Sequence, residues 1–110
     1  MSAAPAPPVE PAPAERDDPG SDDRIVREAA HIRAIRSDLA AGRAAAALIA
    51  CEAGDASFAD GVFAVEREGL RVLALYELGR RDQAERAAAR YLAAHPRGPL
   101  VAKIRAVYDP

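Results

Sequence analysis

The chain has 110 residues, a formal net charge of −2, one cysteine and no tryptophan. A single cysteine excludes an intrachain disulfide and a zinc site built on several thiolates, and no apolar run is long enough to cross a bilayer. Half of the residues are hydrophobic, but alanine supplies much of that half and only 5% are aromatic, so the composition favours helix over sheet.

The first part of the chain combines proline, alanine and acidic residues. Because proline blocks helix and few large side chains are available to bury, we expect residues 1–20 to form a disordered, acidic tail or linker. Residues 21–110 are expected to form one helical domain. Charge divides near the same place: up to residue 23 there are six acidic residues and one basic, and from residue 24 onward fourteen basic and eleven acidic. An electrostatic contact between tail and domain is a hypothesis that this division leaves open.

The first helix is predicted to begin near Ser21, whose hydroxyl can cap it while Asp22 and Asp23 lie at the positive end of the helix dipole. Gly42 is predicted to end it. His31 falls on the polar side and is expected to face solvent. Apolar residues recur every three or four positions on the other side: Ile25, Ala29, Ile32, Ile35 and Leu39.

A second helix is predicted from Arg43 to Ala53, where nearly all residues are small and apolar. We therefore expect it to be packed between neighbours, with Gly54 and Asp55 ending it. Cys51 occupies an inward position in this helix, and no histidine lies near it in sequence, so a buried, inert thiol is expected.

Three further helices follow. The third is predicted from Val62 to Leu78 and ends at Gly79. The fourth is predicted from Asp82 to Ala94, because Pro96 prevents continuation. A short fifth helix is predicted to begin at Pro99, a favourable first-turn residue, and to end near Tyr108.

The sequence repeats itself after 37 residues, since the stretch 39–47 aligns with the stretch 76–84. Each half contains a long helix, a glycine turn and an alanine-rich helix. Gly42 and Gly79 supply the tight turns, and Ala47 and Ala84, five residues later, allow the paired helices to approach closely.

This pattern resembles a tetratricopeptide repeat, because Gly79, Ala84 and Pro96 have the spacing of that family's turn glycine, packing alanine and terminal proline. The stretch 63–100 is similar to the short C-terminal repeat domains of bacterial cell-envelope and sigma-factor-regulating proteins. The chain departs from the family at Arg71, Val72 and Ala88, and its period of 37 residues exceeds the usual repeat of about 34.

The resemblance implies an all-α fold, a TPR-like stack of two helix hairpins plus a short C-terminal capping helix, forming a fragment of a right-handed α-solenoid. It also implies that another protein binds on a concave surface lined by the first helix of each repeat. The resemblance implies no catalytic residue.

Two charged residues, Arg36 and Glu66, fall on otherwise apolar sides of the first and third helices. Burying either charge alone is unfavourable, so an ion pair between the two helices is predicted. A ligand-binding role in an inter-helix groove and simple exposure are the alternatives.

Basic residues gather in the last part of the chain, where the stretch 79–108 carries seven basic residues against two acidic. A solvated face is one interpretation, and a surface for an anionic protein partner is the other. Nucleic acid is not expected, because no aromatic residues are interleaved for stacking. The candidate partner-binding residues are Arg80, Arg81, Arg86, Arg90 and Arg97.

No metal or cofactor is expected. The two histidines and the cysteine lack ligand spacing, and no phosphate-binding glycine loop occurs. His95 precedes the terminating proline and is expected to hydrogen-bond the last carbonyls of the fourth helix.

Helical repeats usually need about three units, whereas this chain has two hairpins and part of a third, so one end should remain apolar. We therefore expect a non-enzymatic protein-protein interaction module, a scaffold or adaptor that binds a partner through the groove or the open end of the hairpins. The alternative is a structural unit that forms a homodimer through its terminal helices. Without a secretory signal or membrane-spanning run the chain is expected in the cytoplasm. If it is a fragment, the alternative is an envelope-facing domain of a membrane-anchored protein.

Overall fold

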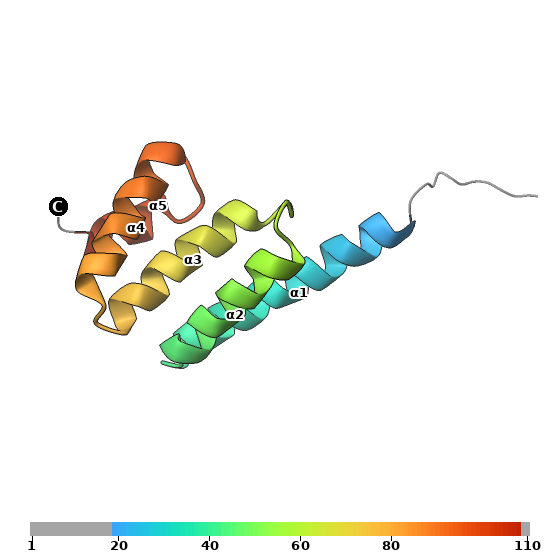
Figure 1. Ribbon diagram of the computed structural model, residues 1–110, viewed down its shortest axis with the longest axis horizontal. Helices are drawn as coiled ribbons and strands as arrows, with labels where there is room; N and C mark the ends of the chain where they lie inside the picture. Colours follow the sequence, from blue (N-terminus) through green and yellow to red (C-terminus); the bar gives the residue numbers. More distant parts are fainter. Residues whose placement is uncertain (1–18, 109–110) are drawn as a thin grey trace, which may run out of the picture.

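A computed structural model describes residues 19–108, with side chains from Asp22 onward (Figure 1). Within this range all regular structure is helical and no strand occurs, which confirms the all-α prediction for the described residues. The predicted disordered tail lies almost wholly outside them. The helices are α1 (Pro19–Ala40), α2 (Ala44–Ser57), α3 (Ala64–Glu77), α4 (Arg81–Ala94) and α5 (Val101–Val107).

Two identical turns connect α1 to α2 and α3 to α4. Gly42 and Gly79 have φ angles of +79° and +76°, the left-handed region that favours glycine. At the first turn the Gly42 N–H donates to the Leu39 carbonyl and the Arg43 N–H to the Asp38 carbonyl. The N–H groups of residues 79 and 80 donate to the carbonyls of residues 76 and 75 in the same pattern. Both helices therefore end in a Schellman motif, 37 residues apart.

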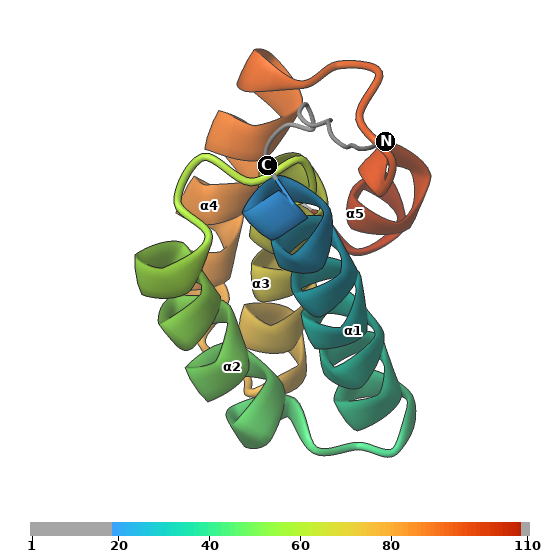
Figure 2. The same ribbon diagram turned by 90° about the vertical axis from the view of Figure 1, so that its right-hand side faces the viewer.

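The helix α3 lies at the centre of the molecule. Helices that follow one another pack together from α1 to α4, and α3 also contacts α1 and α5. Figure 2 shows α2 and α4 on one side of α3 and α1 and α5 on the other. Every other helix thus depends on α3 or on a helix that touches it.

Small residues let the helices of each hairpin approach closely. Ala47 in α2 and Ala84 in α4, equivalent positions of the repeat, are both 0% exposed. The core also buries larger side chains, among them Ile35, Leu75 and Tyr91. Gly69 in α3 admits α5, because a Cβ there would lie only 2.8 Å from Leu100 Cδ1.

The α2 helix differs from the prediction at its C-terminal end. It continues through Gly54 to Ser57 instead of ending at Gly54. Gly54 is needed here for close approach, since a Cβ would lie 2.3 Å from His31 Nε2 and 2.6 Å from Arg67 Cδ. The expectation that α2 packs between neighbours is confirmed, because it contacts both α1 and α3, although Ile49 on its outer side is 67% exposed.

The N-terminal end of α1 projects beyond the other helices (Figure 1). The helix begins at Pro19, earlier than the predicted Ser21, and proline suits a first turn. All residues from Asp22 to Arg27 are exposed, and we call this segment, residues 22–27, the α1 overhang. Ile25, predicted to be on the buried side, is 41% exposed because no neighbouring helix reaches that far.

Candidate functional site

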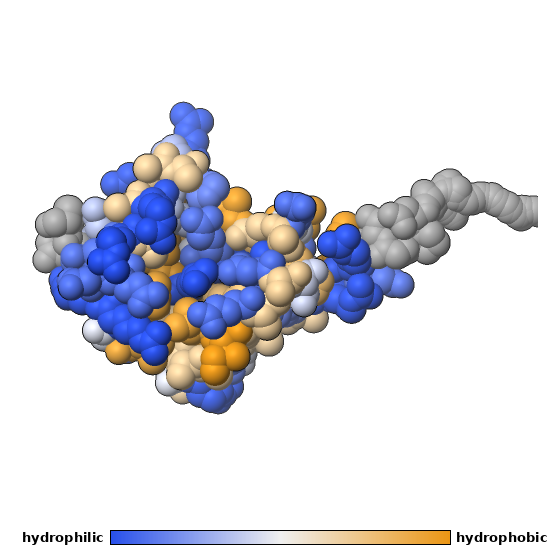
Figure 3. All heavy atoms as spheres, in the orientation of Figure 1, coloured by the Kyte–Doolittle hydropathy of each residue, from blue (hydrophilic) through white to orange (hydrophobic). Residues whose placement is uncertain are grey.

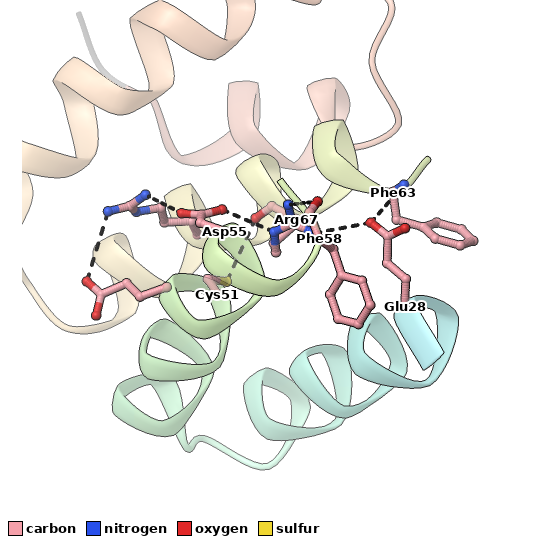
Figure 4. Close-up of polar contacts among 8 residues, drawn as sticks. Glu28, Cys51, Asp55, Phe58, Phe63 and Arg67 are labelled. Carbon is pink, nitrogen blue, oxygen red and sulfur yellow. Dashed lines mark hydrogen bonds and ion pairs between the residues drawn. The ribbon is translucent and has the colours of Figure 1, made fainter. Parts of the chain in front are cut away.

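The side chain of Arg67 is buried at the junction of α1, α2 and α3 (Figure 4). Its Nη1 donates to Glu28 Oε2 at 3.2 Å and its Nε to Asp55 Oδ1 at 3.1 Å. Nη2 donates to the carbonyl oxygen of Phe58 at 3.0 Å. One guanidinium therefore holds α1, α2 and the segment after α2 against α3. We call Glu28, Asp55, Phe58 and Arg67 the Arg67 cluster.

Glu28 is the buried anion of this cluster, and its side chain is 3% exposed. Its Oε2 accepts a second hydrogen bond from the backbone N–H of Phe63 at 3.1 Å. A Cβ at Gly61 would lie 2.1 Å from the same oxygen, so the loop closes over the carboxylate only because residue 61 is glycine. The buried carboxylate thus has both a cation and a backbone donor, as burial of a charge requires.

The cluster extends outward to solvent through a second arginine. Arg71 Nη1 donates to Asp55 Oδ2 at 3.2 Å, and Arg71 Nη2 lies 4.0 Å from Glu52 Oε2. The side chains of Asp55 and Glu52 are 51% and 57% exposed. Each carboxylate in this group faces an arginine, so the group has the character of a structural ion-pair network.

Cys51 lies beside the cluster as a buried, free thiol, as the sequence predicts. Its Sγ donates weakly to the carbonyl oxygen of Arg67 at 3.8 Å. Burial, and to a smaller extent the charge of Asp55, raises the pKa of the thiol from 9.0 to about 11. At neutral pH the sulfur is therefore protonated and a poor nucleophile.

Arg36 Nη2 of α1 and Glu66 Oε2 of α3 form an ion pair, and these are the two residues that the sequence analysis paired. Their side chains are 51% and 14% exposed, so the pair lies at the edge of the helix contact and not inside it. Arg36 also lines an apolar groove between α1, α3 and α5.

An apolar groove runs between α1, α3 and α5. Its volume is about 460 Å³, a size common for binding sites in proteins. Arg36, Glu77 and Lys103 are its charged residues. We call it the α1–α3–α5 groove, and its apolar lining residues are Leu39, Ala40, Leu70, Leu73, Leu100 and Val107, together with the ring of Tyr76.

A second groove, of about 360 Å³, lies on the opposite side of α3, between α2 and α4. Its lining is largely charged and includes Asp55, Arg67 and Arg71 of the ion-pair network. Glu68 and Arg90 also line it. Because most of these groups already pair with each other, this groove offers less apolar contact than the α1–α3–α5 groove.

The five candidate arginines, residues 80, 81, 86, 90 and 97, are all exposed. None of them lines the α1–α3–α5 groove, and Arg90 alone lines the second groove. Arg86 lies by a shallow hollow next to Tyr108, and Arg81 pairs with Glu85 at 3.3 Å. Figure 3 shows hydrophilic residues gathered over α4, and the exposed candidate arginines of this helix lie apart from the apolar groove.

One of the two histidines, His31, differs from its prediction. The ring of His31 packs against Phe58 with 5.6 Å between ring centroids, and its Nε2 is buried without a hydrogen-bond partner among the described residues. The unexpected continuation of α2 past Gly54 covers it. The backbone N–H of His95 donates to the Tyr91 carbonyl in the last turn of α4, as predicted, and the side-chain Nε2 lies 3.3 Å from Glu68 Oε1.

The sequence analysis missed Glu28 and Arg67, the two buried charges of the described residues. The signal was present, because Glu28 lies four residues before Ile32 and Arg67 three residues before Leu70, both on apolar helix sides. Opposite charges at two such positions indicate a buried ion pair.

Comparisons of the chain with protein-family models, with curated proteins and with solved structures found no match. Among residues 19–108 no group of histidine, cysteine and carboxylate side chains has an arrangement that could hold a metal ion. None of the helices in that range combines the length and apolar character needed to cross a membrane.

Proposed function

We propose that this chain is a protein-protein interaction module whose α1–α3–α5 groove binds an apolar segment of a protein. The observation that carries the proposal is the groove itself, in which leucine and valine side chains from three different helices line one continuous depression. An apolar depression of this size exposed to water gains free energy when apolar side chains fill it.

The charges at the groove favour a peptide segment with an acidic residue. Lys103 has no ion-pair partner among the described residues, whereas Arg36 is held by Glu66. An acidic side chain of the ligand next to Lys103 would complement that charge and fix the orientation of the ligand. The proposal assigns no catalytic step to the chain.

The architecture that we propose is the TPR-like stack implied by the resemblance, in the form of a right-handed α-solenoid fragment. Two matching Schellman turns and two equivalent buried alanines, Ala47 and Ala84, support it. In that architecture α1 and α3 are the first helices of the two repeats, and these helices line the groove together with α5.

Selection of a random peptide library displayed on phage, with the full chain as bait, tests the proposed function. We expect the selected peptides to share two or three large apolar residues and one acidic residue. Leu73→Glu or Val107→Glu should lower the affinity for each of these peptides at least tenfold, because either change places a charge in the apolar lining. Ile49→Glu, which changes an exposed residue of α2 outside the groove, is the matched control.

Two results would show that the groove is not the binding site. Either the library yields no peptides, or the selected peptides bind the two groove variants as tightly as they bind the unaltered chain. Val107 is 42% exposed, so its substitution should leave the fold intact and separate loss of binding from loss of structure.

The second candidate function is self-association as a structural unit through the terminal helices. The exposure of apolar residues at both ends, Val26 in α1 at 65% and Val107 in α5 at 42%, favours it. These two surfaces can also act together.

A further inference from the structure

We propose that the occupant of the α1–α3–α5 groove is the α1 overhang of a second copy of this chain, so that two copies form a closed, two-fold dimer. This inference rests on the proposed function, because it uses the same groove as the docking site. It adds the identity of the partner and the segment that binds.

The α1 overhang has the chemistry that the groove requires. It is a helical segment that exposes two large apolar residues, Ile25 at 41% and Val26 at 65%. Figure 1 shows no other helix beside this segment, and both residues are exposed. An amphipathic helix laid into an apolar groove is a common mode of recognition.

The overhang and the groove lie on the same side of α1. Ile25 and Arg36 are eleven residues apart, close to three helical turns of 3.6 residues, and Asp22 and Ala40 are eighteen apart, close to five turns. Arg36 and Ala40 line the groove. Asp22 and Ile25 therefore point to the same side as the groove, from the opposite end of the helix.

The charges on this side are complementary. Because residues of a helix are spaced by about 100°, Arg24 and Arg27 point away from the line through Asp22 and Ile25. Asp22 is thus the charge that the overhang presents on the groove side. In the groove Lys103 lacks an ion-pair partner among the described residues, although Glu77 at the rim offsets part of its charge.

One two-fold axis is enough to satisfy both copies. Ile25 and Leu39 lie fourteen residues apart on α1, or about 21 Å along the axis at 1.5 Å per residue. Two antiparallel α1 helices, related by an axis near their middle, place the overhang of each copy at the groove of the other. Each copy then gives one segment and accepts one, which closes the assembly as a dimer and not as a filament.

Sedimentation velocity of the full chain, from about 5 to about 500 µM, tests the dimer, because a self-associating species shifts with concentration. We expect a monomer-dimer equilibrium. Ile25→Glu, in the overhang, and Val107→Glu, in the groove, should each raise the dimer dissociation constant at least tenfold. Ile49→Glu, on the outer side of α2, should leave it unchanged. Circular dichroism spectra of all three variants should match that of the unaltered chain.

Mixing the two weakened variants gives the sharper test. The intact groove of the Ile25→Glu chain can still bind the intact overhang of the Val107→Glu chain. The mixture should therefore form a heterodimer at concentrations where neither variant dimerises alone. Reversing one charge, Asp22→Lys or Lys103→Glu, should weaken the dimer, and the variant with both reversals should recover part of the lost affinity.

Several results would overturn the second copy as occupant. A chain that stays monomeric at all these concentrations, a dimer lost only with Ile49→Glu, open chains longer than a dimer, or a mixture that fails to associate would each do so. A monomer that still binds phage-selected peptides through the groove would leave the proposed function standing. If Val107→Glu left the dimer dissociation constant unchanged and peptide selection also failed, both the dimer proposal and the proposed function would be wrong.

Discussion

Arg67 brings one positive charge into the interior with a side chain only 2% exposed, and its partners come from three parts of the chain. The two charges of a buried pair have each lost their water, so each depends on the other. Removing one partner therefore leaves an uncompensated charge, whereas the exposed pair between Arg43 and Asp38 can recover solvation by water.

Glu28→Ala is predicted to lower the free energy of unfolding by about 3 kcal/mol, because it leaves the buried Arg67 charge without this carboxylate and the Phe63 N–H without its acceptor. Glu28→Gln, which keeps an oxygen acceptor, should lower it by about 2 kcal/mol. Urea unfolding followed by circular dichroism gives both values. Asp38→Ala is the control and should change the free energy by less than about 1 kcal/mol. Equal losses for residues 28 and 38 would contradict the account.

The raised pKa of Cys51 predicts how stability depends on alkaline pH. In the unfolded chain the thiol loses its proton near pH 9.0, but in the folded chain only near pH 11. Between these values the folded state binds more protons, so its stability falls as pH rises from about 9 to about 11. Cys51→Ala, which has no proton to lose, should show a smaller fall in urea unfolding over that range. Alkylation by iodoacetamide at pH 8 should also be at least about 100-fold slower in the folded chain than in urea.

For single residues, the sequence predicts whether a side chain is buried or exposed better than it predicts which residues that side chain contacts. The pairing of Arg36 with Glu66 follows from two charges on apolar helix sides. The same reasoning applies to Glu28 and Arg67, but their meeting depends on a loop that folds back over α1 and on Gly61, which leaves room for the carboxylate. Such a close approach is set by the tertiary structure and has no local signal.

The helices themselves end where their glycines allow the chain to reverse. Gly42 and Gly79 have positive φ angles, and a Cβ at either would meet nothing within 4 Å. Substitution there therefore tests backbone strain separately from steric crowding.

Gly42→Ala and Gly79→Ala are each predicted to lower the free energy of unfolding by about 1 to 2 kcal/mol, because alanine is strained in the left-handed region. Asparagine, which tolerates that region, should lose less at both positions. Thermal unfolding of the four variants measures this. If alanine were tolerated at one turn only, the two turns would not be equivalent, and the internal repeat would lose its main support.

The number of helices and their order follow from sequence, because glycine, proline and apolar periodicity act locally. Gly54 is the exception to this local rule, because this glycine lies inside α2 and does not end the helix. Its role is to admit His31 and Arg67 at distances where a Cβ would clash. A glycine used for close packing and one used for a turn look alike in a single sequence.

Across the described part of the molecule, α3 contacts each of the other helices directly. Neither hairpin has a core of its own that excludes the other, since the residues of α3 pack against both. A domain built in this way should unfold as one unit.

Native-state hydrogen exchange is predicted to show one common opening free energy for the slowest amides of α2, α3 and α4. The amides of the α1 overhang should exchange far more readily, because no neighbouring helix covers them. Two distinct free energies, one for each hairpin, would show that the hairpins fold independently and would argue against a single core.

The groove was expected only in general terms, as a concave surface implied by the resemblance. Its actual position depends on α5, which follows an irregular segment and docks where Gly69 leaves space for Leu100. For the basic stretch the sequence leaves a solvated face and a partner surface both open; its five candidate arginines lie outside this groove, whereas Lys103 lines it. Net charge along a chain does not tell which side of the fold is apolar.

Alanine-rich helices have smooth surfaces, and such surfaces can slide past one another with little change in contact energy. The guanidinium of Arg67 limits this freedom, because its three nitrogen atoms must meet oxygen atoms from residues 28, 55 and 58 at once. A shift of α2 by one turn, about 5.4 Å, would break two of these bonds. The arginine therefore favours one alignment of the helices over any that is shifted by a turn.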